Sequence, residues 1–141
     1  SQMTADKIPI KSGAHAVLQA AKKKGLKLAV VSSTVSSRAI PLLENADLLT
    51  YFDVHVFGDE VMAHKPLPDP YLAALAKLGV EDSLALAVED SFTGALSATK
   101  AGLTVFLVPD KSFNAQFFDA ALAQLTLFGV GNDLHELADK L

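Results

Sequence analysis

The stretch Leu28-Ala29-Val30-Val31 is apolar without interruption, and three hydroxyl residues, Ser32-Ser33-Thr34, follow it directly. A short run with no polar alternation is typical of a strand that is covered on both faces, as strands are in a parallel sheet. Residues 84–88 are apolar in the same way, as are most of residues 103–108, while 54–57 is a shorter candidate and 125–128 a weaker one. The sequence therefore predicts a sheet of parallel strands.

Amphipathic stretches separate these apolar runs, with apolar residues three, four and seven positions apart, the spacing of one helix face. The expected buried stripes are Ala14-Val17-Leu18-Ala21, Ile40-Leu43-Ala46, Leu72-Leu75-Ala76, Ala95-Ala98-Ala101 and Leu134-Leu137-Leu141. The expected N-terminal caps are Ser12, Ser36 or Ser37, Asp69 and Asp133. The alternation of strands and helices predicts an α/β fold: a Rossmann-like parallel sheet with helices on both faces.

The composition fits one folded domain. The chain has 141 residues, 50% hydrophobic and 20% charged, which is enough apolar material for a buried core. A formal net charge of −4 argues against a nucleic-acid partner, whose phosphates attract basic surfaces. No stretch reaches the ~18 apolar residues of a membrane span, and no secretory signal is recognisable. The absence of cysteine excludes disulfides and thiol catalysis, and we expect a cytoplasmic protein.

Polar side chains follow three of the predicted strands. The hydroxyl residues 32–34 follow the first, Lys65 follows the second after a short interval, and Glu89 and Asp90 follow the third. In parallel α/β folds, ligands bind beyond the carboxyl ends of the strands. Hydroxyl groups and backbone N–H groups at a helix N-terminus bind phosphoryl oxygens, a lysine neutralises their charge, and adjacent carboxylates can hold Mg²⁺. The combination indicates a phosphate held near a divalent metal ion.

Each of these groups also has a purely structural interpretation. The hydroxyl residues 32–34 could cap the next helix, Lys65 could be a solvated loop lysine, and Asp90 or Ser91 could cap the helix that follows. Three polar clusters at three strand ends are harder to explain as independent structural features. Their joint occurrence therefore favours the phosphate site.

The order of these motifs resembles the haloacid dehalogenase-like (HAD) phosphohydrolase superfamily, in the branch that contains phosphoglycolate phosphatases and beta-phosphoglucomutases. The likeness extends from about Lys11 to Leu141. Residues 29–33 are similar to the second motif of that family, residues 58–70 to its third and residues 88–102 to its fourth.

The resemblance implies an Mg²⁺-dependent phosphohydrolase, a phosphatase or a phosphosugar mutase, that acts on a small phosphorylated metabolite. By that analogy Ser32, with Ser33 beside it, would bind the transferring phosphoryl group, and Lys65 would neutralise its charge. Asp90 would be a magnesium ligand, and Glu89 would be either a ligand or the partner of one.

One family feature is missing. Members of the family begin with a strand that ends in Asp-x-Asp, whose first aspartate is the nucleophile, and no Asp-x-Asp occurs in these 141 residues. The resemblance therefore implies a truncated core without its nucleophile. Residues 1–10 would be a remnant of the cap domain and its linker, and residues 11–141 an incomplete HAD-like core domain. The alternative is a catalytically inactive phosphate-binding or oligomerisation module derived from that family.

The missing strand is central in the family, between the strands of the second and fourth motifs. An empty slot there would expose unpaired backbone groups on both sides. We expect a separate N-terminal fragment or a second copy of the chain to fill the slot, or the two flanking strands to pair directly.

Overall fold

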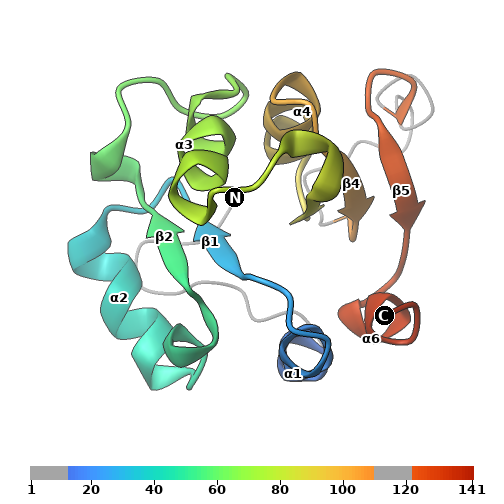
Figure 1. The fold of residues 1–141 in the computed structure, drawn as a ribbon. Coiled ribbons are helices and arrows are strands. Elements are labelled where there is room, and N and C mark those ends of the chain that lie inside the picture. Colours follow the sequence, from blue (N-terminus) through green and yellow to red (C-terminus); the bar gives the residue numbers. More distant parts are fainter. Residues whose placement is uncertain (1–12, 110–121) are drawn as a thin grey trace.

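The computed structural model describes residues 13–109 and 122–141, in which strands alternate with helices (Figure 1). The strands are β1 (Ala29–Val31), β2 (Val54–Val56), β3 (Leu86–Glu89), β4 (Thr104–Leu107) and β5 (Leu127–Val130). The α-helices are α1 (Ala14–Lys23), α2 (Ser36–Asn45), α3 (Asp69–Leu78), α4 (Phe92–Lys100) and α6 (Leu134–Ala138). Short 3-10 helices are η1 (Leu49–Tyr51), η2 (Gly58–Glu60) and η3 (Asp82–Leu84). Residues 1–10, the expected cap remnant, lie outside the described residues.

All strand pairings are parallel, and helices cover both faces of the strands. In Figure 1, α3 and α4 lie on one side of the strands, while α1, α2 and α6 lie on the other. This arrangement confirms the predicted α/β fold class. In the part of the chain that the structure describes, no helix combines the length and apolar character needed to cross a membrane.

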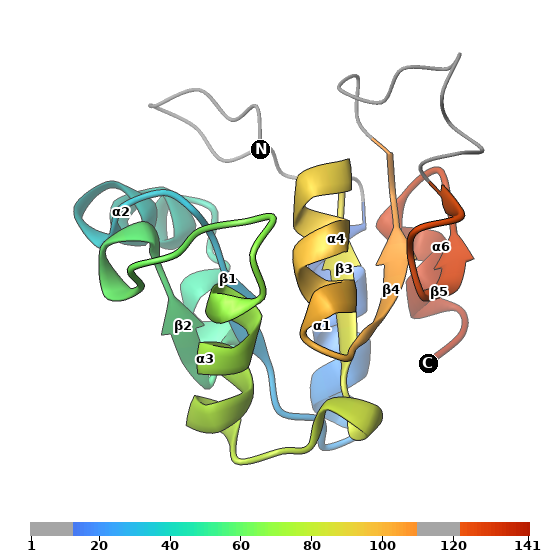
Figure 2. The ribbon, with the colours of Figure 1, turned by 90° about the horizontal axis from the view of Figure 1, so that it is seen from above.

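The strands form two sheets rather than one. β1 pairs with β2, while β3, β4 and β5 form a second sheet in that order. β1 and β3 are the neighbouring edges of the two sheets, and we call the space between them the seam (Figure 2). The expectation that these two strands would pair directly is wrong. Filling of the seam by another polypeptide stays a prediction.

Two helices explain why the sheets do not close on each other. Ala14 and Leu18 of α1 pack against the core of the second sheet around Phe106 and also against the core around Phe57 beside the first sheet. On the opposite face, α3 lies on β1 and β2, and its Tyr71 belongs to the core of the second sheet. Neighbouring strands lie about 4.8 Å apart, so direct pairing of β1 with β3 would require both helices to repack.

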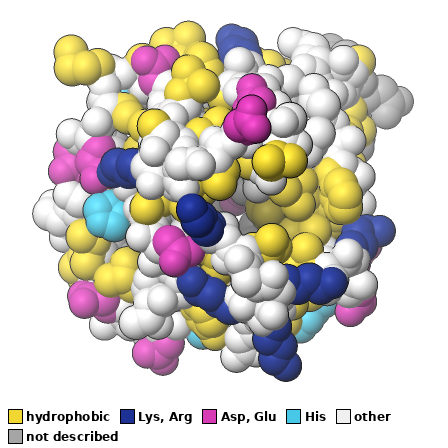
Figure 3. Space-filling model, in the orientation of Figure 1, with side chains coloured by type: hydrophobic (Ala, Val, Ile, Leu, Met, Phe, Trp, Pro, Cys, Tyr) yellow, Lys and Arg dark blue, Asp and Glu magenta, His cyan; other side chains and the backbone are white. Residues whose placement is uncertain are grey.

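The seam leaves apolar surface uncovered. Val88 is 42% exposed although it lies within β3, where the sequence predicted a strand covered on both faces. Figure 3 shows apolar side chains lining a hollow between the two sheets. The second sheet is therefore incompletely covered where it faces the first.

Of the predicted N-terminal caps that fall in the described residues, one agrees with the structure and two are displaced by one residue or more. The side chain of Asp133 caps α6 as expected. Ser12 lies outside the described residues, and α1 begins after Gly13. The N-cap of α2 is Val35 rather than Ser36 or Ser37. The N-cap of α3 is Pro68, so Asp69 is already the first helical residue.

The predicted stripe of α3 is partly wrong. Tyr71 and Ala74 are buried, whereas Leu72 and Ala76 are exposed. The true buried face therefore begins one residue earlier, and it includes a tyrosine that the apolar pattern left out. By contrast, the small-residue stripe that begins at Ala95 is buried as predicted.

Candidate functional site

The hydroxyl loop follows β1 and is fixed by its own backbone contacts. Ser32 N–H donates to Val56 O at 2.9 Å, which extends the pairing with the β2 strand. The Ser32 hydroxyl accepts a hydrogen bond from Thr34 N–H at 3.1 Å. No residue of the 32–34 loop is the N-cap of α2, since that position belongs to Val35. The interpretation of these hydroxyls as simple helix caps is therefore wrong.

A glycine of η2 keeps the hydroxyl loop close to the end of β2. Gly58 N–H donates to Thr34 O at 2.9 Å, and a Cβ at Gly58 would overlap Ser33 O. Only a residue without a side chain allows this close approach. The sequence analysis did not assign this role, because glycine spacing alone does not show which loops meet.

The N-terminus of α2 is occupied by a carboxylate of the protein itself. Asp59 accepts hydrogen bonds from the backbone N–H of Ser36 at 2.8 Å and from its hydroxyl at 2.6 Å. These hydrogen bonds lower the pKa of the Asp59 carboxyl group. The first turn of α2 is thus already matched with negative charge.

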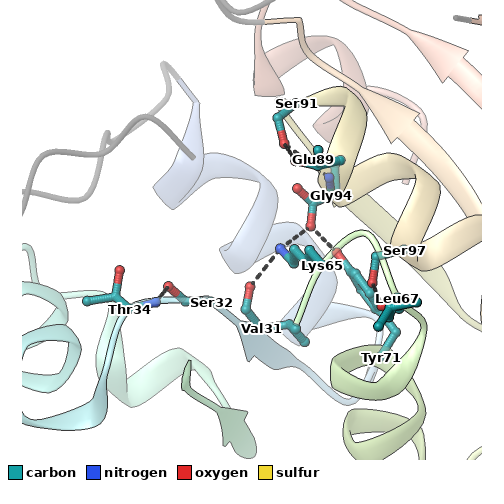
Figure 4. Close-up of polar contacts among 11 residues, drawn as sticks. Val31, Ser32, Thr34, Lys65, Leu67, Tyr71, Glu89, Ser91, Gly94 and Ser97 are labelled. Atoms are coloured by element: carbon teal, nitrogen blue, oxygen red, sulfur yellow. Dashed lines mark hydrogen bonds and ion pairs between the residues drawn. The ribbon is translucent and has the colours of Figure 1, made fainter. Parts of the chain in front are cut away.

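Lys65 links the two sheets at the carboxyl ends of β1 and β3. Its Nζ lies 2.5 Å from Glu89 Oε2 and 3.3 Å from Val31 O (Figure 4). The side chains of Lys65 and Glu89 are only 12% and 7% exposed. An ion pair this deeply buried is not an ordinary surface pair, and removing one partner leaves a buried unpaired charge. Lys65 is therefore not a solvated loop lysine.

Both oxygens of the Glu89 carboxylate are closely surrounded by other residues. Its Oε2 accepts hydrogen bonds from both Lys65 and the Tyr71 hydroxyl. A Cβ at Gly94 would overlap its Oε1, so the first turn of α4 passes directly over the carboxylate. Gly94 thus makes room for the carboxylate of Glu89, five residues before it in the same segment.

Tyr71 is a site residue that the sequence analysis missed. Burial and the adjacent charge of Glu89 raise the pKa of its hydroxyl well above the ordinary value. The Lys65 ammonium lies 5.4 Å from the centre of its ring. One signal could have found it: a buried tyrosine needs a partner for its hydroxyl.

The predicted site residues are brought together to different degrees. Lys65 and Glu89 are in direct contact, and Ser32 directly follows the Val31 whose carbonyl Lys65 binds. Ser33 is exposed in the same loop. Ser91 caps α4 by accepting from Gly94 N–H at 3.1 Å, which confirms its structural interpretation. No hydrogen bond between Lys65 and the hydroxyl loop is present in the described residues.

The carboxylates fit a metal ion only in part. The described residues contain no group of three His, Asp or Glu side chains arranged to hold a metal. Glu89 Oε2 is already occupied by Lys65 and Tyr71, which suits a partner of the site rather than a direct ligand. Asp90, half-buried beside it, fits as one protein ligand, because Mg²⁺ commonly takes one or two carboxylates with water and phosphate oxygens.

The hydroxyls, the buried lysine and the carboxylates lie at the strand ends of a parallel α/β fold, which is where folds of this class bind their ligands. The chain is a member of the haloacid dehalogenase-like hydrolase family, whose family model matches residues 1–108. This finding confirms the resemblance drawn from the motifs.

The similar proteins point to one branch of that family. The chain is 41% identical over 91 residues to the phosphorylated carbohydrates phosphatase of Thermotoga maritima, covering 64% of this chain and 42% of that protein. It is 38% identical over 97 residues to the phosphoglycolate phosphatase of Nitrosospira multiformis, covering 69% of this chain and 43% of that protein. The crystal structure of CbbY from Rhodobacter sphaeroides in complex with phosphate is similar with a TM-score of 0.78 at 29% identity, covering 90% of this chain and 55% of that chain. The chain therefore spans about half the length of these proteins.

Proposed function

We propose that this chain supplies the phosphate-binding half of an Mg²⁺-dependent phosphohydrolase, a phosphatase or phosphosugar mutase, for a small phosphorylated metabolite. The observation that carries the proposal is the buried Lys65, whose ammonium contacts the ends of β1 and β3 beside the hydroxyl loop. Family membership and the phosphatases among the similar proteins support the reaction class.

Counting the hydrogen-bond donors of Lys65 supports an anionic ligand. An ammonium has three N–H donors. Among the described residues, Val31 O and Glu89 Oε2 take two of them. The third can bind an oxygen of a phosphoryl group, and the low local dielectric strengthens that attraction. Ser32 and Ser33 would hold the other phosphoryl oxygens.

Two parts of the reaction need groups beyond those described. Asp90 would hold Mg²⁺, which when bound offsets the negative charge of the phosphoryl group. The attacking carboxylate has no candidate in an Asp-x-Asp motif of this sequence. In our proposal it comes from polypeptide outside these 141 residues.

Calorimetric titration with inorganic phosphate, with and without Mg²⁺, tests the proposal. We expect the chain to bind phosphate and Lys65→Met to weaken binding by about tenfold or more, because a charge-assisted hydrogen bond is lost. The matched control is Lys27→Met, which removes an exposed lysine whose side chain donates to Leu78 O, away from Glu89 and the hydroxyl loop. Equal losses in the two variants, or no binding by the parent chain, would contradict the proposed site.

The absence of Asp-x-Asp favours a second candidate, an inactive phosphate-binding module. A chimera that places before this chain the N-terminal part of the Thermotoga maritima phosphatase that the chain does not match separates the two. Hydrolysis of p-nitrophenyl phosphate by the chimera supports the phosphohydrolase. Phosphate binding without any turnover supports the inactive module.

A further inference from the structure

The hydroxyl of Tyr71 meets the site at the atom that already binds the lysine. It donates to Glu89 Oε2, the same oxygen that accepts a hydrogen bond from Lys65 Nζ (Figure 4). We propose that Tyr71 is a positioning residue: it fixes the Glu89 carboxylate and thereby directs the Lys65 ammonium to the end of β1. This inference rests on the proposed phosphate site. It adds Tyr71 as the residue that orients the Lys65 ammonium within that site.

The packing of Tyr71 does not require its hydroxyl. Its ring lies in the core cluster that includes Ala95 and Leu107, where a phenylalanine ring would fill the same volume. The oxygen instead finds a charged acceptor inside the protein, where an unpaired hydroxyl would be costly. The hydroxyl therefore has a role that ring packing alone does not explain.

The carboxylate has few alternatives once Tyr71 is in place. Gly94 closes the Oε1 side, and Tyr71 and Lys65 share Oε2. Without the phenol, only the flexible lysine would hold Oε2, and the carboxylate could rotate and draw the ammonium away from Val31 O. Tyr71, held in the α3 helix, thus limits the movement of the Lys65 ammonium through their shared contact with Glu89.

The phenol must keep its proton in order to donate. Burial together with the nearby carboxylates of Glu89 and Asp90 raises the Tyr71 pKa, so the hydroxyl stays protonated at neutral pH. The contact is therefore available under the conditions in which a phosphate ester would bind.

Phosphate titration of four proteins tests the route through Glu89: the parent chain, Tyr71→Phe, Glu89→Gln and the double variant. We expect Tyr71→Phe to weaken phosphate binding about tenfold, equivalent to about 1.4 kcal/mol. Because Tyr71 acts through Glu89, the double variant should bind phosphate as Glu89→Gln does. The inference would be overturned if Tyr71→Phe reduced phosphate affinity equally in the parent chain and in Glu89→Gln, or if it reduced affinity in neither.

Tyr51→Phe is the matched control, since the Tyr51 hydroxyl contacts His15 and, among the described residues, lies outside the site. Its phosphate affinity should equal that of the parent chain. A cooperative thermal transition in Tyr71→Phe shows that any loss of affinity does not come from unfolding.

A second readout needs no phosphate. The sequence has two tyrosines and no tryptophan, so the fluorescence of Tyr51→Phe comes from Tyr71 alone. A carboxylate acceptor quenches tyrosine emission, and adding Glu89→Gln should raise the intensity. Unchanged emission would show that the contact with Glu89 is absent in solution and would overturn the inference. If the emission rises but the parent chain binds no phosphate, the proposed function fails while the contact stands.

Discussion

Glu89 shows how strongly one residue can depend on a neighbour that lacks a side chain. Lys65 and Tyr71 hold its carboxylate in place, and Gly94 provides the space for it. Glycine within a helix normally costs stability relative to alanine, so only a specific steric need justifies it here.

Alanine normally stabilises a helix relative to glycine, but Gly94→Ala should destabilise this protein. We expect the free energy of unfolding to fall by about 1–3 kcal/mol, because the new methyl group displaces a carboxylate that cannot move freely. Urea denaturation measures the change. The matched control is Gly129→Ala, whose Cβ would meet only Phe106 at 3.4 Å, with an expected effect within about 0.5 kcal/mol. A stabilised Gly94→Ala would show that Glu89 is not held as described.

At the scale of single elements, α2 depends on a residue from another part of the chain. Val35 supplies no side-chain cap, and Asp59 of η2 binds the N–H and hydroxyl of Ser36 instead. An anionic partner at a helix N-terminus is favourable because of the free N–H groups and the helix dipole. The α2 helix is thus tied to the turn that follows β2.

This contact predicts a dependence of stability on acidity. The Ser36 hydrogen bonds lower the Asp59 pKa below its ordinary value of 3.8, so below that pH the unfolded chain binds more protons than the folded one. The stabilisation is present above pH 3.8 and is lost as the pH falls through the lower folded-state pKa. When the pH is lowered from 5 to below 3.8, the melting temperature of Asp59→Asn should therefore fall less than that of the parent chain. If Asp59→Asn lost as much stability on acidification as the parent chain, this contribution would be ruled out. Asp139→Asn is the control, and its loss of stability on acidification should match that of the parent chain.

The strands and helix caps show which parts of the fold can be predicted from the sequence. Short, mainly apolar runs correctly predicted the positions of β1 to β4, because strands that are largely covered by helices leave a local signal in the sequence. Cap residues that bind their own helix, such as Ser91 and Asp133, were equally accessible. The cap of α2 was not, since Asp59 lies 23 positions away from Ser36.

The same limit applies to the candidate site. The sequence predicts Lys65 and Glu89 as site residues because both come after apolar runs, and the structure brings them into contact. Tyr71 was missed because it lies within a helix, where a tyrosine is ordinarily core packing. Contacts between a helix interior and a strand end depend on tertiary structure, which no local pattern encodes.

At the scale of the whole molecule, the seam is the feature that remains incomplete. Two parallel edges face each other without a strand between them in the described part of the chain, and Val88 is exposed beside one of them. Free sheet edges and exposed apolar surface favour pairing with another polypeptide. We propose that a second copy fills the seam when no N-terminal fragment is supplied.

Sedimentation over a range of concentrations tests this proposal. We expect reversible self-association of the parent chain and a monomer for Val88→Lys, because a charge in the seam opposes burial. Leu84→Lys is the matched control: Leu84 is 78% exposed but lies in η3, before β3 begins, and its variant should associate as the parent does. A parent chain that remains monomeric at all concentrations would exclude self-association.

The seam also has a consequence for the exchange of backbone amide hydrogens with solvent deuterium. Along a parallel strand, the N–H and C=O of one residue point to one side and those of the next residue to the other. Val31 faces the seam, where its carbonyl meets Lys65, whereas the amide of Ser32 donates to Val56 O. At concentrations where the chain is a monomer, two consecutive amides should therefore differ widely in protection factor, with Val31 exchanging at nearly the rate of a loop residue and Ser32 exchanging only when the β1–β2 sheet opens.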